Sequence, residues 1–300
     1  ITIIGAGQNL TLITNPASPL LPPPGPFTEY ALIQTAQNIG DVHISNLQTT
    51  NNPVNDGHSI LLQTGGSVKN CRIIDGSLGV YVRVESATTN VVVENNFIQS
   101  SIFAVACQGS GVTATILNNT LNLFNPGFSV GIWVGVDFGP IVKLTATGNS
   151  INNYVYRGIV GNSNNTVLTE NSILGTGQYA IENTAAPAMA TCNWYGSSDQ
   201  FVVASKISGA VNFSPWLANG TDNDLSSIGF QPVPGSCAGR QLFYVNDNSL
   251  TGDVFTTAVG NNANNGSPSA PLATITAALV KAQPGDFILV DAGSYTEIVN

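Results

Sequence analysis

A six-residue phrase recurs six times between Val42 and Ile173. The copies begin at residues 42, 68, 93, 116, 146 and 168 and read VHISNL, VKNCRI, VENNFI, ILNNTL, ATGNSI and LTENSI. Each copy ends on an apolar residue, and these final residues are spaced 22 to 30 positions apart. Internal periods of this size are typical of chains that fold as stacked repeats, so the spacing predicts a solenoid.

The segments between the phrases predict strands and turns rather than helices. The apolar runs SILLQT, GVYVRV, VVVENN and GIWVGV are short, β-branched and interrupted by Asn, Gly and Ser. Helical repeats would instead show an apolar period of 3.6 residues over ten or more positions. A period of about 25 residues accommodates one coil of three short strands, and such coils stack about 4.8 Å apart. The alternative is a β-sandwich with Asn-rich turns.

A polar or small residue stands two positions before the last residue of each phrase. An Asn at this position could bond through its amide to the same position in the next coil, as in the amide ladders of cross-β stacks. The predicted ladder consists of Ser45, Cys71, Asn96, Asn119, Asn149 and Asn171.

The repeated phrases resemble those of right-handed parallel β-helix proteins with pectate-lyase-like repeats. This resemblance implies an all-β solenoid. The later stretch NWYG (193–196), followed by SPWL (214–217), is similar to the terminating segment of bacterial surface β-helix modules. We therefore expect residues 1–217 to form one β-helix body. The aromatic residues Trp194, Tyr195 and Trp216 would either close its open end or offer a sugar-stacking platform, with Trp194 and Tyr195 as the candidate ligand contacts.

The rest of the chain predicts a connection followed by a second element. Residues 218–240 contain Gly, Pro, Ser and Asp without a period, which predicts a linker. Residues 241–300 resemble the opening of secreted β-helix proteins, with a YV strand, a capping helix near 272–282 and the stretch PGDFILV. The resemblance implies the cap and first coil of a next module, and hence tandem copies that pass from YTEIVN into ITIIGAG.

The charge composition excludes several classes of partner. Only 8% of residues are charged, against roughly 25% in typical soluble domains. The net charge of −9 argues against nucleic acid and anionic membranes, which attract Lys and Arg. No apolar run approaches the ~18 residues of a membrane-spanning helix.

The four cysteines suit an extracytoplasmic protein but do not suggest a zinc site. None forms a CxxC pair. They are either four buried thiols or include one disulfide, for which the pair Cys192 and Cys237 is the candidate.

The ionisable residues do not predict catalysis. Lyases and hydrolases of this fold need clustered acidic and basic side chains, whereas the few cations here are scattered. Lys69 and Glu94 share a register and predict a salt bridge between coils. His43 should point outward, and His58 in DGHS lacks the acidic partner segments of polygalacturonases. An ice-binding solenoid would need regular Thr-x-Thr rows, and the threonines are irregular.

Two loops supply candidate ligand sites. Asp247 and Asp253 are candidate Ca²⁺ ligands, because they lie among side-chain amides in an oxygen-rich loop; the alternative is that they only form turns. The segment 12–34 interrupts the coils with a proline run that cannot be a ladder strand, so we expect an extended loop with Phe27 and Tyr30 as candidate contact residues; the alternative is a loop folded back over a coil.

These observations predict a non-catalytic structural module of a long, secreted, repetitive cell-surface protein. The closest resemblance is to adhesin-like proteins of Bacteroidota. Its partners would be neighbouring copies of itself, and it would need no cofactor apart from the Ca²⁺ considered above. The alternative from another class is a carbohydrate-binding or carbohydrate-active β-helix protein with a surface polysaccharide as its partner.

Overall fold

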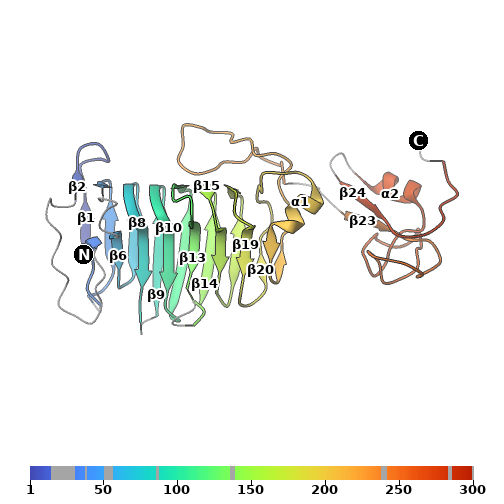
Figure 1. Ribbon diagram of the computed structural model, residues 1–300, viewed down its shortest axis with the longest axis horizontal. Coiled ribbons are helices and arrows are strands. Elements are labelled where there is room, and N and C mark those ends of the chain that lie inside the picture. The colour runs from blue at the N-terminus through green and yellow to red at the C-terminus, as the bar shows by residue number, and fades with distance from the viewer. Residues whose placement is uncertain are drawn as a thin grey trace. The chain divides into compact units, whose positions relative to one another are not determined.

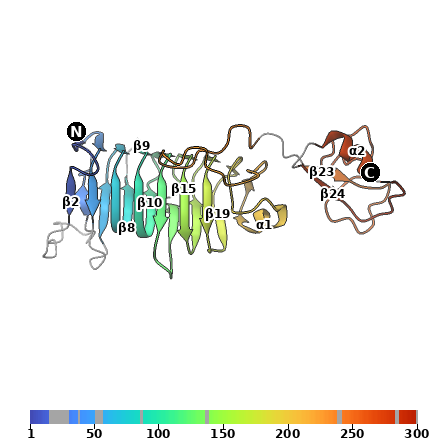
Figure 2. The ribbon, with the colours of Figure 1, turned by 90° about the horizontal axis from the view of Figure 1, so that it is seen from above.

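The computed structural model describes residues 1–14, 31–37, 39–50, 57–85, 88–135, 139–237, 242–282 and 286–298. The chain divides into two compact units (Figures 1 and 2). The first comprises residues 1–213 and 219–236, and the second comprises residues 214–218 and 237–300. Among the described residues, neither helix has the length and apolarity needed to cross a membrane.

One face of the first unit is a parallel sheet with nine strands among the described residues. Each strand comes from a successive coil, and between two neighbours the chain passes through the second sheet. In order they are β1 (Thr2–Ile4), β4 (Val42–Ser45), β7 (Gly66–Lys69), β9 (Thr89–Glu94), β11 (Val112–Leu117), β14 (Lys143–Thr147), β17 (Thr166–Thr169), β20 (Ala188–Met189) and β22 (Val211–Asn212).

The second parallel sheet has two arms, joined by the long strands β8 (Arg72–Arg83) and β10 (Phe97–Gln108). The first arm continues through β2 (Leu12–Thr14), β5 (Gln48–Thr50), β12 (Thr120–Leu123), β15 (Ser150–Tyr154) and β18 (Ser172–Gly175). The second arm continues through β3 (Ala31–Gln34), β6 (His58–Leu62), β13 (Val130–Val134), β16 (Arg157–Gly161), β19 (Tyr179–Asn183) and β21 (Ile207–Ser208).

The core consists of apolar residues stacked in rows from coil to coil. Ile44, Val68, Val93 and Ile116 occupy equivalent positions of the first sheet and are at most 1% exposed. The second sheet contributes two more rows, listed as Ile73, Ile98, Leu121, Ile151 and Ile173 in one arm and Ile60, Val80, Val105, Ile132, Ile159 and Ile181 in the other. The predicted parallel β-helix is therefore confirmed, with about seven turns.

The turn between the two sheets explains the recurring phrase. One residue before each ladder position has a positive φ between 50° and 66°. These residues are Asn46, Asn70, Asn95, Asn118, Gly148, Glu170 and Cys192. Asn and Gly tolerate this left-handed conformation best, which accounts for their frequency in the phrase. The left-handed residue turns the chain, and the next side chain enters the interior.

The Asn ladder runs through the buried side of this turn. Nδ2 of Asn96 donates to Oδ1 of Asn119 at 3.0 Å, Asn119 to Asn149 at 2.9 Å, and Asn149 to Asn171 at 2.9 Å. The backbone N–H of each donor residue also donates to the same oxygen. All four side chains are fully buried, and a buried amide is tolerated only when its hydrogen bonds are made.

The structure corrects the ladder at both ends. Ser45 lies within β4 and pairs with Lys69, so it is not a ladder residue. Leu47 occupies that position instead, because the left-handed residue Asn46 precedes it and its carbonyl accepts from Arg72. The first phrase had been aligned two residues too early. At the other end, Asn193 extends the ladder by accepting from Nδ2 of Asn171 at 2.9 Å.

The segment predicted as a linker packs against the β-helix. Phe230 is 3% exposed, and its N–H donates to the carbonyl of Gly148 at 2.7 Å. The N–H of Gly229 donates to Oγ1 of Thr120 at 3.0 Å. Residues 219–236 therefore belong to the first unit rather than to a linker. The anchoring residue Phe230 is a single aromatic in a polar stretch, which a period search does not detect.

A second difference concerns helices and the SPWL segment. The short helix α1 (Gln200–Ser205) was not predicted; Asp199 caps it by accepting from the N–H groups of Phe201 and Val202. Residues 214–218, which contain SPWL, group with the second unit and not with the β-helix body.

The second unit contains β23 (Leu242–Val245), α2 (Ile275–Lys281) and β24 (Phe287–Val290), and its two strands are parallel. Helix α2 begins three residues later than the start of the predicted range and is capped by Thr274. Its packed side contains Ile275 and Ala278, whereas Leu279 is 42% exposed.

Candidate ligand-binding surface

The residues predicted as a sugar platform do not form one. Tyr195 is fully buried, and its hydroxyl donates to the carbonyl of Ala190 at 3.0 Å. Trp194 forms a parallel β-bridge with Ser172. The next residue, Tyr195, therefore lies beside Ile173 in the core row. The side chain of Tyr195 thus ends that row, as an end plug would. Trp194 is half-buried. Phe27 and Tyr30 lie outside the described residues.

Trp216 belongs to the second unit. It is fully buried and stacks on Phe287 with ring centroids 5.5 Å apart.

The two candidate calcium ligands hold turns in the second unit. Asp247 accepts from the N–H groups of Ser249 at 2.7 Å and Ser294 at 3.1 Å. Asp253 accepts from Nδ2 of Asn246 at 2.7 Å. Within the described residues, no three His, Cys, Asp or Glu side chains are arranged to hold a metal ion. Calcium binding stays a prediction: Asp247 is accounted for as a turn-forming group, whereas Oδ1 of Asp253 and Oδ1 of Asn246 are buried without a hydrogen-bond partner among the described residues.

Asp291 is the most heavily hydrogen-bonded carboxylate of the second unit. It accepts from the N–H groups of Val254, Phe255 and Thr256 and from the Thr256 hydroxyl, at 2.7 to 3.0 Å. Desolvation by burial opposes ionisation, but these hydrogen bonds outweigh it and hold the pKa of Asp291 well below its ordinary value. Sequence reasoning did not single out this residue.

The cysteines fall into two kinds. Cys71 and Cys107 are buried free thiols, and burial raises the pKa of Cys107 to about 12. Cys192 and Cys237 are each disulfide-bonded, as the predicted pair requires.

The ionisable side chains of the β-helix form isolated pairs. Lys69 and Glu94 make the predicted salt bridge between coils at 2.8 Å. His43 is exposed, as expected, and its Nδ1 lies 2.9 Å from the Ser67 hydroxyl. His58 lies at the start of β6 rather than in a turn, with its ring edge-on to Tyr81.

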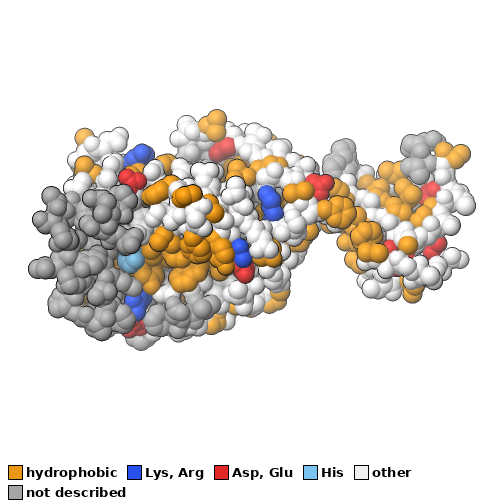
Figure 3. Space-filling view, viewed as in Figure 1, with side chains coloured by type: hydrophobic (Ala, Val, Ile, Leu, Met, Phe, Trp, Pro, Cys, Tyr) orange, Lys and Arg blue, Asp and Glu red, His pale blue; other side chains and the backbone are white. Residues whose placement is uncertain are grey.

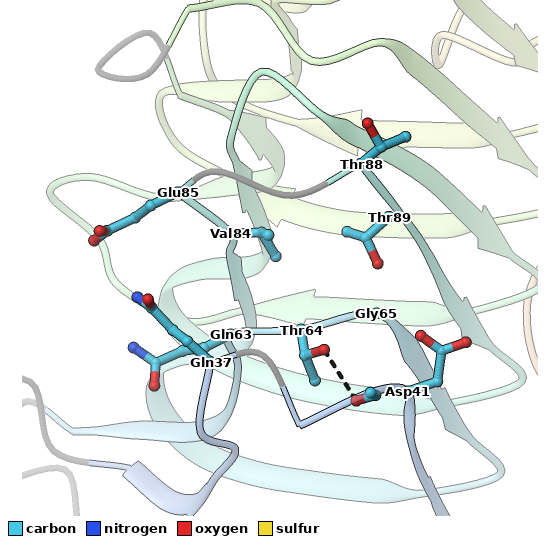
Figure 4. A pocket seen from close by; sticks show the side chains of 10 residues that line it. Gln37, Asp41, Gln63, Thr64, Gly65, Val84, Glu85, Thr88 and Thr89 are labelled. Carbon is cyan, nitrogen blue, oxygen red and sulfur yellow. Dashed lines mark hydrogen bonds between the residues drawn. The ribbon is translucent and has the colours of Figure 1, made fainter.

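A shallow polar pocket of about 290 Å³ lies beside the ends of three coils (Figure 4). Asp41 and Glu85 line it together with hydroxyl and amide side chains, and the Thr64 hydroxyl donates to the carbonyl of Gly40 at 3.0 Å. In Figure 4 the Glu85 carboxylate points away from that of Asp41.

A cluster of aromatic side chains lies on the outer face of the second arm. We call it the aromatic surface and define it as Phe103, Phe128, Trp133, Tyr156, Arg157 and Tyr179. Phe103 stacks on Trp133 with centroids 4.9 Å apart and an interplanar angle of 19°. Phe128 stacks on Tyr156 at 4.7 Å and meets Phe103 edge-on at 5.9 Å. Figure 3 shows hydrophobic side chains gathered on this face over the middle of the β-helix.

Arg157 joins the aromatic surface to its polar edge. Its guanidinium lies 4.0 Å from the ring centroid of Tyr156 and 4.7 Å from that of Tyr179. The same group forms an ion pair with Glu182. Because cation–π contacts and a carboxylate fix the guanidinium together, the two tyrosine rings are held in place.

The sequence contains a signal for this surface in the spacing of four aromatic residues. Phe103, Phe128, Tyr156 and Tyr179 are separated by 25, 28 and 23 residues, which are the spacings of the coil repeat. Aromatic residues that recur with the coil period share a face, whereas the aromatics singled out earlier were chosen from terminal motifs and a loop.

Comparisons with known proteins add one finding. A family model described as "Protein of unknown function (DUF1565)" matches residues 258–300, which lie in the second unit. No curated protein and no solved structure matches the chain.

Proposed function

We propose that this chain is a non-catalytic structural module of a long, secreted cell-surface protein. Its role is to provide length and to display a surface, as a stalk or adhesin-like fibre does. The resemblance of its repeats to bacterial surface β-helix modules supports this assignment, including the suggested relation to Bacteroidota. It requires no cofactor, nucleic acid or membrane insertion.

The observation that carries the proposal is the stack of core rows from coil to coil, together with the ladder amides from Asn96 to Asn193. Each coil contributes about 4.8 Å of length and is stabilised by its two neighbours. Such a structure resists bending because every coil repeats the same buried contacts. The isolated ion pairs of the β-helix also support a structural role, since catalysis on this fold needs clustered carboxylates or a carboxylate–cation set.

The first coil suggests how modules associate. Ile3 occupies the same row as buried Ile44 but is 38% exposed, and Ile1 and Ile4 are each 68% exposed. Among the described residues, no strand pairs with the outer edge of β1 or with the second edge of β24. An open strand edge is a template for pairing with another chain. We therefore assign β24 of a second copy as the partner of β1.

This association is head to tail, because the two edges lie in different parts of the chain. Heterologous contacts of this kind produce open assemblies when the rotation does not close a ring. Sedimentation velocity over rising protein concentration, with negative-stain electron microscopy, should show end-to-end chains of modules. Ile3→Asp should abolish them, whereas Leu225→Asp, at a residue that is 88% exposed, should not.

Two results would contradict the structural proposal. One is a particle that stays monomeric at every concentration while Ile3→Asp changes nothing. The other is release of reducing or unsaturated sugar ends when the protein is incubated with polysaccharides, because this would require a catalytic site.

A further inference from the structure

We propose that the aromatic surface is a binding site for a neutral polysaccharide chain. The proposal goes beyond the structural role, because it assigns a ligand to the side of the β-helix rather than to its ends.

The rings are accessible as well as ordered. Phe128 is 39% exposed and Tyr156 is 41% exposed, although each is stacked on a neighbour. A Cβ at Gly135 would collide with Cη2 of Trp133, so glycine makes room for the indole to lie along its strand. Large exposed apolar groups cost free energy in water, and a contiguous patch of them marks an interaction site.

The chemistry of the patch favours sugars over an aliphatic protein partner. Its members are aromatic rings with polar groups at their margins: Gln178 donates to the Tyr179 hydroxyl at 3.0 Å, and Arg157 pairs with Glu182. Pyranose rings present C–H faces to aromatic rings and hydroxyls to amides, guanidinium and carboxylate groups. Binding sites for such ligands combine aromatic walls with a few placed polar groups. A second copy would instead need a complementary aliphatic patch.

The arrangement suits a chain rather than a single sugar. Phe103, Phe128, Tyr156 and Tyr179 come from four successive coils. Three coil steps of about 4.8 Å span roughly 14 Å along the β-helix. A ligand that contacts all four rings must therefore extend over several sugar units.

The charges select a neutral ligand. Arg157 is the cation of the aromatic surface, and Glu182 already neutralises it. The chain as a whole carries a net charge of −9, which repels polyanions. Uronic-acid polymers would need unpaired Lys or Arg groups, since carboxylates bind chiefly through charge-assisted hydrogen bonds.

The proposal is tested by isothermal titration calorimetry with the full chain. The probes are neutral hexasaccharides of glucose, mannose, galactose and xylose, with oligogalacturonate as the acidic comparison. We expect binding of at least one neutral probe and a loss of at least tenfold in affinity for Trp133→Ala and for Tyr156→Ala. Trp133→Phe should retain part of the affinity. Phe201→Ala, at a 66% exposed residue of α1, is the matched control and should bind normally.

Folding of each variant is checked by far-UV circular dichroism and by its urea midpoint. A loss of affinity is interpreted only for variants that are folded. Three outcomes overturn the proposal: no probe binds, the acidic probe binds best, or Trp133→Ala and Tyr156→Ala bind as the wild type does. Loss of self-association in these variants would instead assign the surface to a second copy. The end-to-end assembly of modules is tested by Ile3→Asp, so either proposal can fail alone.

Discussion

Oδ1 of Asn149 accepts two hydrogen bonds from Asn119, one from its backbone N–H at 3.0 Å and one from its Nδ2 at 2.9 Å. One amide oxygen thus fixes both the backbone position of the adjacent coil and the orientation of the ladder side chain in that coil. Because the same pair of bonds recurs along the ladder, each amide orients its neighbour, and the network strengthens cooperatively.

Replacing Asn119 with Ala should destabilise the β-helix by about 3 kcal/mol, since a buried donor without an acceptor costs about 1–3 kcal/mol. The substitution leaves the N–H and Nδ2 groups of Asn96 without their acceptor. Urea unfolding followed by circular dichroism measures the change. Asn152→Ala is the control, because that half-buried side chain bonds only to Asn122 and Ser150. Equal midpoints for the two variants would contradict the importance of the ladder.

Replacing Cys71 with Asn should stabilise the protein by about 1 kcal/mol, the typical net value of one hydrogen bond. Cys71 occupies a ladder position, and its N–H already donates to Oδ1 of Asn96 at 2.9 Å. An amide there would add the missing Nδ2 bond to the same oxygen. The urea midpoint should rise for Cys71→Asn and fall for Cys71→Leu. A lower midpoint for the Asn variant would show that the ladder cannot extend into this coil.

The thiols of Cys71 and Cys107 should not react with thiol reagents in the native protein. Burial raises the pKa of Cys107 to about 12 and also raises that of Cys71, so little thiolate forms at pH 8. Titration with Ellman's reagent should detect no thiol in native protein, two in denaturant, and four after reduction. Peptide mapping without reductant should recover Cys192 linked to Cys237. Rapid labelling of the native protein would contradict the buried state of both thiols.

The second unit should lose stability in acid. The folded pKa of Asp291 lies below the value of about 3.9 for an unfolded Asp. Ionised Asp291 therefore stabilises the fold at pH values above about 4, and this contribution is lost as the pH falls toward the folded pKa. Fluorescence of buried Trp216, with the other tryptophans replaced by Phe, reports unfolding of this unit. Asp291→Asn should lower its stability at pH 7 and flatten the decline below pH 4; an unchanged pH profile would contradict this role.

The repeated architecture could be predicted because its signals are local. Each turn is marked by a left-handed residue, a small or amide side chain directly after it, and an apolar residue two positions further on, and this pattern recurs from coil to coil. The shift at Ser45 arose because Leu47 replaces the amide, so the phrase could be aligned in two ways. Asn193 was missed because it was assigned to a terminal motif, although Asn171 bonds to it as to any other ladder residue.

Long-range packing was less predictable. Phe230 attaches residues 219–236 to a coil about eighty positions earlier, at Gly148, through contacts that have no period. The aromatic surface depends on which strands face outward, and this cannot be assigned until the coils are in register. Its rings recur with the coil spacing, but that spacing indicates a shared face only once the coils are aligned.

The ladder also determines how a gene for this fold can change length. Asn118 and Gly148 have the same left-handed turn, and the residues that follow them, Asn119 and Asn149, make equivalent bonds. Excising residues 119–148 would join Asn118 directly to Asn149 and restore the phrase across the junction. Recombination between such phrases removes or adds whole coils, and the remaining coils keep their register in the stack. The repeat that holds the coils together therefore also allows the protein to gain or lose length during evolution, one coil at a time.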